Sequence, residues 1–179
     1  MTLRTFSSKM PDCEYCAMME GGKTLFQSDK IAVALAARPA VPGHVLVMPR
    51  QHFPIMEQVP DHLAGLLFSA ANKVSTTLFE VLRAQGTNIV VENGTAAGQA
   101  VPHFAISVIP RSENDGIGLG WEPRKLSDDE MATAEVALTQ ESSKVSGFEK
   151  EEKKPLRVNA RKETLVKEDY LVRQLRRIP

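Results

Sequence analysis

The feature that most constrains the fold is a long helical pattern set between two groups of short β-rich runs. Between Pro60 and Gly86, apolar residues recur at i, i+3, i+4 and i+7, which places them on one face of an α-helix. Pro60 and Asp61 are typical of a helix start, and Gly86 is expected to cap the C-terminus. The apolar face consists of Leu63, Leu66, Leu67, Ala70, Val74, Leu78, Val81 and Leu82.

The flanking runs predict an antiparallel meander. A Pro- and Gly-containing stretch, residues 38–43, separates two of them and favours a turn. A second helix is expected from Ser127, whose spacing to Glu130 is that of a capping box, to about Ser142. Strands, one long helix and further strands indicate the α+β class. The expected strands are residues 24–27, 31–35, 44–48, 88–91 and 104–109.

Length and composition predict one main domain with a charged extension. The chain has 179 residues, 42% of them hydrophobic, and two cysteines, too few for a disulfide-stapled scaffold. No secretory h-region and no membrane-length apolar run is apparent, so we expect a cytoplasmic protein without membrane attachment. The predicted organisation is a domain with an N-terminal zinc knuckle at 1–125, a helix at 126–143 and a charged extension at 144–179.

Cys13 and Cys16 form a C-x-x-C motif, for which redox, metal and accidental interpretations are open. A redox pair is disfavoured because the motif precedes any thioredoxin-like βαβ pattern. Zinc would need two further ligands, and the chain holds only four histidines. His62 lies at the start of the long helix, where we expect a surface role. His52 follows one predicted strand and His103 opens another, so spacing permits a Cys2His2 site but equally permits surface or core histidines.

Two further motifs decide between these readings. Residues 98–111 read Gly-Gln-Ala-Val-Pro-His-Phe-Ala-Ile-Ser-Val-Ile-Pro-Arg, and residues 42–53 read Pro-Gly-His-Val-Leu-Val-Met-Pro-Arg-Gln-His-Phe. With the C-x-x-C pair, they resemble the ordered motifs of the histidine-triad (HIT) family over about residues 12–125. The resemblance implies an α+β meander with a long helix, a homodimer, and zinc held by Cys13, Cys16, His52 and His103.

The same resemblance implies nucleotidyl chemistry, but the usual nucleophile of that chemistry is absent from this chain. In the family, the middle histidine of the triad attacks phosphorus, which requires a nucleophilic imidazole. Here the triad positions are His103, Ala105 and Ser107, and a methyl group can neither attack nor leave. A ribose-contacting Asp corresponds to Ala36, and a loop Asn corresponds to Glu92. A carboxylate beside a phosphate site would repel the ligand unless neutralised.

Strand alternation predicts where these positions point. His103, Ala105 and Ser107 share one face of their strand, and the bulky apolar residues between them should face the core. Small side chains at Ala36, Ala100 and Ala105 would leave an open cleft. The Gly-containing loop could direct backbone N–H groups at a phosphate. The candidate ligand-binding residues are His44, Asn93, Gly98, Gln99 and Ser107.

Three functions remain open from the sequence. The first is a zinc-containing, degenerate HIT protein that binds a nucleotide or phosphate-containing ligand without triad catalysis. The second is a hydrolase or transferase that uses Ser107 as nucleophile, Glu92 as base, or activated water. The third is an adaptor for RNA or protein that acts through the tail.

The zero net charge conceals an asymmetry that bears on the third function. Residues 1–143 carry 11 Lys and Arg against 16 Asp and Glu, whereas residues 144–179 carry 11 against six. Leu171, Leu175 and Ile178 are spaced as one face of a short basic helix. This composition disfavours nucleic-acid contact by the domain and leaves it possible for the tail.

Overall fold

The structure is a computed structural model that describes residues 12–142. Residue contacts divide the chain into two compact units, residues 1–120 and residues 121–179, and each is described by itself. The expected helix of the tail lies outside the described residues.

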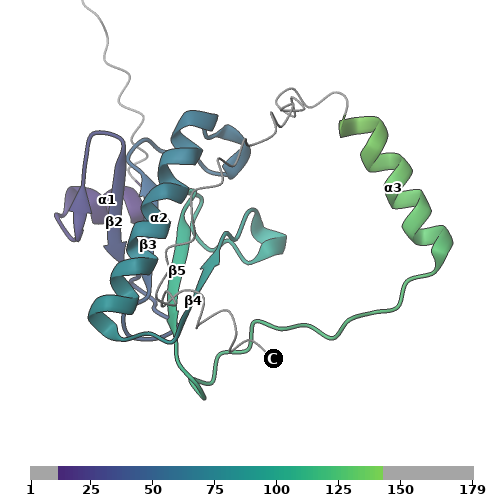
Figure 1. Cartoon of the computed structure of the whole chain (residues 1–179). Coiled ribbons are helices and arrows are strands. Elements are labelled where there is room, and N and C mark those ends of the chain that lie inside the picture. Colours follow the sequence, from purple (N-terminus) through teal and green to yellow (C-terminus); the bar gives the residue numbers. More distant parts are fainter. Residues whose placement is uncertain (1–11, 143–179) are drawn as a thin grey trace, which may run out of the picture. The chain divides into compact units, whose positions relative to one another are not determined.

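A five-stranded antiparallel sheet forms the centre of the first unit, with strand order β1-β2-β3-β5-β4 (Figure 1). The last strand in sequence therefore lies between β3 and β4. The predicted α+β class and meander are confirmed. The strands are β1 (Phe26–Gln27), β2 (Ile31–Leu35), β3 (Val45–Pro49), β4 (Gly86–Val90) and β5 (Ile106–Arg111).

Helix α2 (Asp61–Leu82) lies across one face of this sheet (Figure 1). Its residues Leu63, Leu67 and Leu78 are buried against strand residues that include Val47 and Ile106. Burying such apolar side chains contributes roughly 1.5–3 kcal/mol each. The helix therefore fixes which face of every strand belongs to the main core.

The expected apolar face of α2 was too wide, and its expected end was wrong. Leu66, Val81 and Leu82 are exposed, because the sheet covers only part of the apolar face of the helix. These three side chains line an apolar groove of about 860 Å³ between α2 and the β1–β2 edge. Arg83, with φ of 54°, takes the left-handed C-cap position, and Gly86 instead begins β4.

The opposite face of the sheet carries a second core, built around helix α1 (Glu14–Glu20). Met19 of α1 is buried with Leu46 and Met48 of β3 and with the small residues Ala32 and Ala34 of β2. Alanines on this part of the sheet let α1 approach closely. The N-terminal motif is thereby held against the face that does not carry α2.

Four strands differ in their bounds from the sequence prediction, and β3 lies one residue later than expected. β1 comprises only residues 26–27, because Thr24 and Leu25 belong to the connection from α1. β4 begins two residues earlier than expected, and β5 begins at Ile106 rather than Phe104. The alternation is confirmed across that boundary: Phe104, Ile106 and Val108 are buried in the α2 core.

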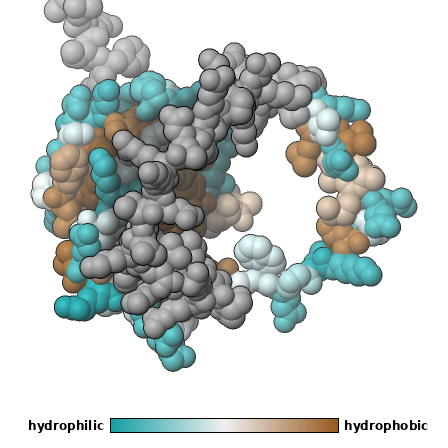
Figure 2. Space-filling view, in the orientation of Figure 1, coloured by the Kyte–Doolittle hydropathy of each residue, from teal (hydrophilic) through white to brown (hydrophobic). Residues whose placement is uncertain are grey.

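In the second unit, α3 (Asp128–Ser142) begins at the predicted capping box. The Ser127 hydroxyl accepts from the Glu130 N–H at 3.3 Å, and Glu130 Oε2 accepts from the Ser127 N–H at 2.8 Å. Apolar side chains such as Leu138 are exposed on this helix, as Figure 2 shows by its brown patches. No helix in the described part of the chain has the length and apolar character needed to cross a lipid bilayer.

Candidate metal centre and adjoining sheet face

Four side chains from three separate segments meet beside the sheet. Cys13 precedes α1, Cys16 lies within it, His52 follows β3, and His103 precedes β5. Their ligand atoms all lie within 4.8 Å of one another, and Cys13, Cys16 and His103 are buried. The two cysteines are not joined by a disulfide. The sequence prediction named this set, and the structure brings all four residues together.

The distances within this group fit a tetrahedral ion. Cys16 Sγ lies 3.5 Å from Nδ1 of both His52 and His103, and Cys13 Sγ lies 3.5 Å from His103 Nδ1. With Zn–S bonds of about 2.3 Å and Zn–N bonds of about 2.0–2.1 Å, tetrahedral angles place S and N about 3.5 Å apart. Two thiolates and two imidazoles are also the donor set that zinc prefers. The group would be closed, with no position left for a substrate.

A backbone carbonyl orients the most buried ligand. His103 is 1% exposed, and its Nε2 donates to the Pro49 carbonyl oxygen at 3.0 Å, which leaves the Nδ1 lone pair directed at the cysteines. Burial lowers the pKa of His103 to about 4, against an opposing effect of the Pro49 hydrogen bond. The imidazole is therefore neutral at neutral pH, the state that binds metal.

Sequence reasoning missed two neighbours of this group, Tyr15 and Pro49. The Tyr15 ring meets the His103 ring edge-on, with centroids 5.9 Å apart. Burial raises the pKa of Tyr15, and the charge of Glu14 adds to this effect while Arg38 opposes it. Tyr15 could have been noticed, since it stands between the two cysteines. The Pro49 carbonyl carried no sequence signal, because any residue offers a backbone oxygen.

Beyond the metal group, the triad positions lie on the sheet face opposite α2, which we call the site face. In the register, Ser107 pairs with Leu46 of β3 and with Val90 of β4. Ala105 is half-buried and packs against the second core, so this face carries a core of its own where the sequence analysis expected an open cleft. The residues of the site face are Ala32, Ala34, Ala36, His44, Leu46, Met48, Asn88, Val90, Ala105, Ser107 and Ile109.

His44 contributes a buried donor to this face. The backbone N–H of Ala36 donates to the His44 carbonyl oxygen, so the β2–β3 ladder continues past Leu35 and places these two side chains opposite each other. His44 Nδ1 accepts from the Ala40 N–H at 3.2 Å, and its Nε2 is buried without a hydrogen-bond partner. Burial lowers the pKa of His44. The neutral ring therefore carries its proton on Nε2.

Asn93 and Gln99, expected to bind ligand, use their amides inside the protein. Asn93 Oδ1 accepts from the Met56 N–H at 2.9 Å, and Asn93 Nδ2 donates to Glu57. Gln99 Oε1 accepts from the Gly94 N–H at 2.8 Å, while its Nε2 donates to the carbonyl oxygens of Pro54 and Val101 at 2.7 and 2.9 Å. Both side chains thus attach the loop of residues 93–101 to the segment after β3.

The backbone of this loop is also internally bonded. The Gly98 N–H donates to the Thr95 carbonyl oxygen, and the Gln99 N–H donates to that of Gly94, each at 3.1 Å. Gly94 and Gly98 have φ values of 88° and 94°, a region that side chains disfavour. These two N–H groups are therefore not directed at a phosphate in this conformation.

We expect Gln99→Ala to lower the free energy of unfolding by about 1–3 kcal/mol, because it leaves the Gly94 N–H and two carbonyls without their partner. The exposed Gln58 offers a matched control, and Gln58→Ala should change stability by less than about 0.5 kcal/mol. Urea denaturation of both variants measures the difference. Equal stability of the two variants would show that the Gln99 amide does not hold the loop.

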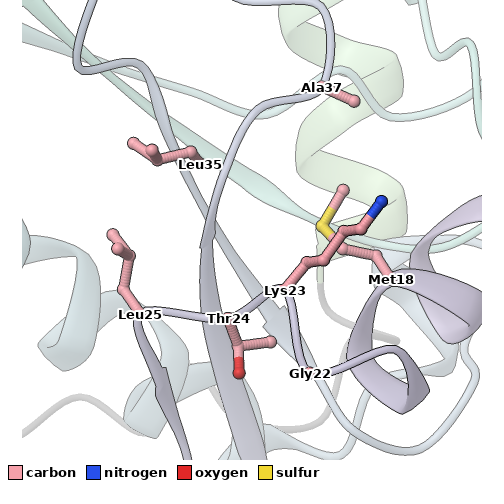
Figure 3. A pocket seen from close by; sticks show the side chains of 7 residues that line it. All are labelled: Met18, Gly22, Lys23, Thr24, Leu25, Leu35 and Ala37. Carbon is pink, nitrogen blue, oxygen red and sulfur yellow. The ribbon is translucent and has the colours of Figure 1, made fainter.

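A separate hollow of about 480 Å³ lies near the end of α1 (Figure 3). Lys23 is the charged side chain among those shown there, beside Met18, Leu25 and Leu35. None of the predicted ligand-binding residues lines it. His62, expected at the surface, is exposed near the start of α2.

The family model of the HIT domain matches residues 20–114, and the chain belongs to this family. It is 30% identical over 112 residues to adenylylsulfatase HINT3 of Arabidopsis thaliana, covering 61% of this chain and 57% of that protein. It is 33% identical over 107 residues to the asymmetrical bis(5'-nucleosyl)-tetraphosphatase of Schizosaccharomyces pombe, covering 59% of each. The chain thus spans less than two thirds of the length of both enzymes.

Solved structures share this fold. SMU.412c from Streptococcus mutans superposes with a TM-score of 0.70 at 23% identity, covering 76% of this chain and 89% of that one. A zinc-bound histidine triad family protein from Mycobacterium smegmatis superposes with a TM-score of 0.57 at 25% identity, covering 75% of this chain and 98% of that one.

Proposed function

We propose that this protein binds a nucleotide or nucleotide-like ligand on the site face without triad catalysis, and that zinc held by Cys13, Cys16, His52 and His103 supports that face. The observation that carries the proposal is the contrast between an assembled Cys2His2 group and a methyl group at Ala105. His103 belongs both to the Cys2His2 group and to the three triad positions. A metal held by His103 would therefore position the segment that carries Ala105 and Ser107. The HIT fold and the nucleotide-processing relatives support the ligand class.

The geometry disfavours catalysis by Ser107 with His44 as its base. These residues are diagonal neighbours on β5 and β3, about 7–8 Å apart between Cα atoms. A general base needs a lone pair on the nitrogen that faces the hydroxyl. Because His44 Nδ1 is occupied by the Ala40 N–H, its Nε2 carries the proton and can only donate. His44 is therefore assigned to ligand binding.

Calorimetric titration with a panel of nucleosides and nucleotides tests the proposal. We expect at least one to bind, and we expect His44→Leu to weaken that binding roughly three- to tenfold through loss of one hydrogen bond. The control His62→Leu changes an exposed histidine on α2 and should leave the affinity unchanged. Absence of binding across the panel, or unaltered affinity in folded His44→Leu, would contradict the proposal.

The predicted homodimer has support from one flank of α2. The hydroxyls of Ser75 and Thr87 lie 2.7 Å apart, so this side of α2 faces β4, the edge strand of the sheet. Phe68 and Phe79 are on the same side of the helix, and they are exposed together with Ile89 of β4. We propose that a second copy covers this flank.

The domain limits, the cytoplasmic location and a role of the tail in contacting RNA or protein remain predictions.

A further inference from the structure

His44, Ser107 and Glu92 are polar groups at different positions on or just beside the site face, which also carries Asn88. His44 lies in the row of Ala36, Ile109 and Asn88, and Ser107 lies in the next row with Leu46 and Val90. β4 ends at Val90, so Glu92 lies just beyond the strand, where its charge adds to the effect of burial in raising the pKa of Tyr15 on the α1 side of the sheet. Val91 packs against the core on the α2 side, so Glu92 points to the site face.

His44 shows that this face is built to receive a polar group. The side chain is only 9% exposed, and its Nε2 has no hydrogen-bond partner. A buried N–H donor without an acceptor is energetically unfavourable. A ligand oxygen on the site face would remove that cost. Ala34 is buried under α1, whereas Ala36 and Ala105 are only partly buried, so the small side chains that a ligand could approach are these two.

Glu92 places a negative charge where a nucleotide phosphate was expected. A Cβ built on Gly98 would lie 3.4 Å from Glu92 Oε1, so the carboxylate lies directly against the Gly-Gln loop. The Gly98 and Gln99 N–H groups that could have attracted a phosphate are bonded within that loop. Glu92 is exposed, and its carboxylate is therefore accessible to a ligand.

The guanidinium groups of Arg111 and Arg38 are already engaged by protein oxygens, and Arg111 stands six residues along the chain from Ala105. Arg111, at the end of β5, donates to Asp115 at 2.6 and 2.8 Å and to the Asn88 side chain and the Ile117 carbonyl. Arg38, beyond β2, pairs with Glu14 at 3.1 Å. A phosphate beside Glu92 would therefore meet like charge without a cation released to balance it.

We propose that Glu92 makes this site prefer an uncharged nucleoside over the corresponding nucleotide, with the His44 Nε2–H donating to a ligand oxygen. The inference rests on the proposed function and narrows its ligand class. A free hydroxyl on the nucleoside can donate to the Glu92 carboxylate, whereas a phosphate can only accept at neutral pH. Glu92 is thus assigned as a specificity-determining residue.

The test compares adenosine with adenosine 5'-monophosphate by calorimetry at low salt without added divalent cations. The two negative charges of the phosphate lie near the Glu92 carboxylate. The affinity for the nucleotide should therefore be at least about tenfold lower than the affinity for the nucleoside. Glu92→Gln keeps the shape and removes the charge, so the two affinities should converge. Glu80→Gln, on the exposed side of α2, is the matched control and should preserve the difference.

Each remaining outcome has a defined meaning. If the nucleotide binds the unmodified protein as tightly as the nucleoside, and Glu92→Gln changes neither affinity, the inference is overturned while the proposed function stands. If neither ligand nor any other nucleotide binds any folded variant, the inference and the proposed function are both wrong. If Glu92→Gln has the same melting temperature as the unmodified protein, a change in its affinities does not result from altered folding.

Discussion

Replacing Cys16 with serine is expected to release the metal and to lower the melting temperature by on the order of 10 °C. Cys16 Sγ contacts the Nδ1 atoms of both histidines, so it is central to the group. The group joins α1 to the segments that follow β3 and precede β5. Metal binding of this kind contributes directly to folding free energy, and a serine hydroxyl is a poor zinc ligand at neutral pH.

Metal analysis and thermal unfolding measure this prediction on the same samples. Protein purified without a chelator should contain about one zinc per chain, and Cys16→Ser should contain almost none. Ala17→Ser introduces the same side chain one position further along α1, where it is exposed, and should retain both metal and stability. Retention of zinc by Cys16→Ser, or its absence from the unmodified protein, would refute the site.

Introducing an imidazole at position 105 should give the protein a covalent nucleotidyl intermediate. Ala105 lies on the site face next to the row of Ser107, the position that the family resemblance assigns to the nucleophile. We expect Ala105→His to raise adduct formation from an adenosine phosphoramidate at least about a hundredfold. The Glu92 carboxylate repels the phosphate of the substrate. The double variant Ala105→His, Glu92→Gln should therefore form more adduct than Ala105→His alone.

The control for this variant is a histidine at a neighbouring position. Ser107→His places an imidazole one row further along the same face, out of line with the expected nucleophile. Reactions stopped with a denaturant at alkaline pH, which preserves the acid-labile histidine–phosphorus bond, and analysed by intact mass should show the adduct for Ala105→His alone of the two. Equal labelling of both variants would indicate nonspecific reaction, and the assignment of position 105 would then be wrong.

The sequence predicted elements whose local pattern and packing agree. Residues 31–35 are continuous apolar residues bounded by polar turns, and the strand occupies those residues. The Ser127–Glu130 spacing predicted the start of α3 because the two residues satisfy each other's backbone N–H groups without any tertiary partner. The metal group was predictable because few residue types bind zinc and the chain offers few of them.

Features that depend on tertiary partners were not predictable. Nothing local marks Arg83 as a left-handed cap, since the sequence offered the better candidate Gly86 three residues later. Asn93 and Gln99 have ordinary polar side chains, and only the folded chain shows that their partners are in the segment after β3. The approach of Glu92 to Gly98 results from the path of the loop. The composition of this segment predicted a loop but not the direction in which it turns.

The most direct test of the central claim is the mass of the unmodified protein after a brief incubation with excess adenosine phosphoramidate. We expect a metal-loaded protein whose polypeptide mass is unchanged, because Ala105 offers no nucleophile. A nucleotidyl adduct formed on the catalytic timescale and mapped to any site-face residue would contradict it.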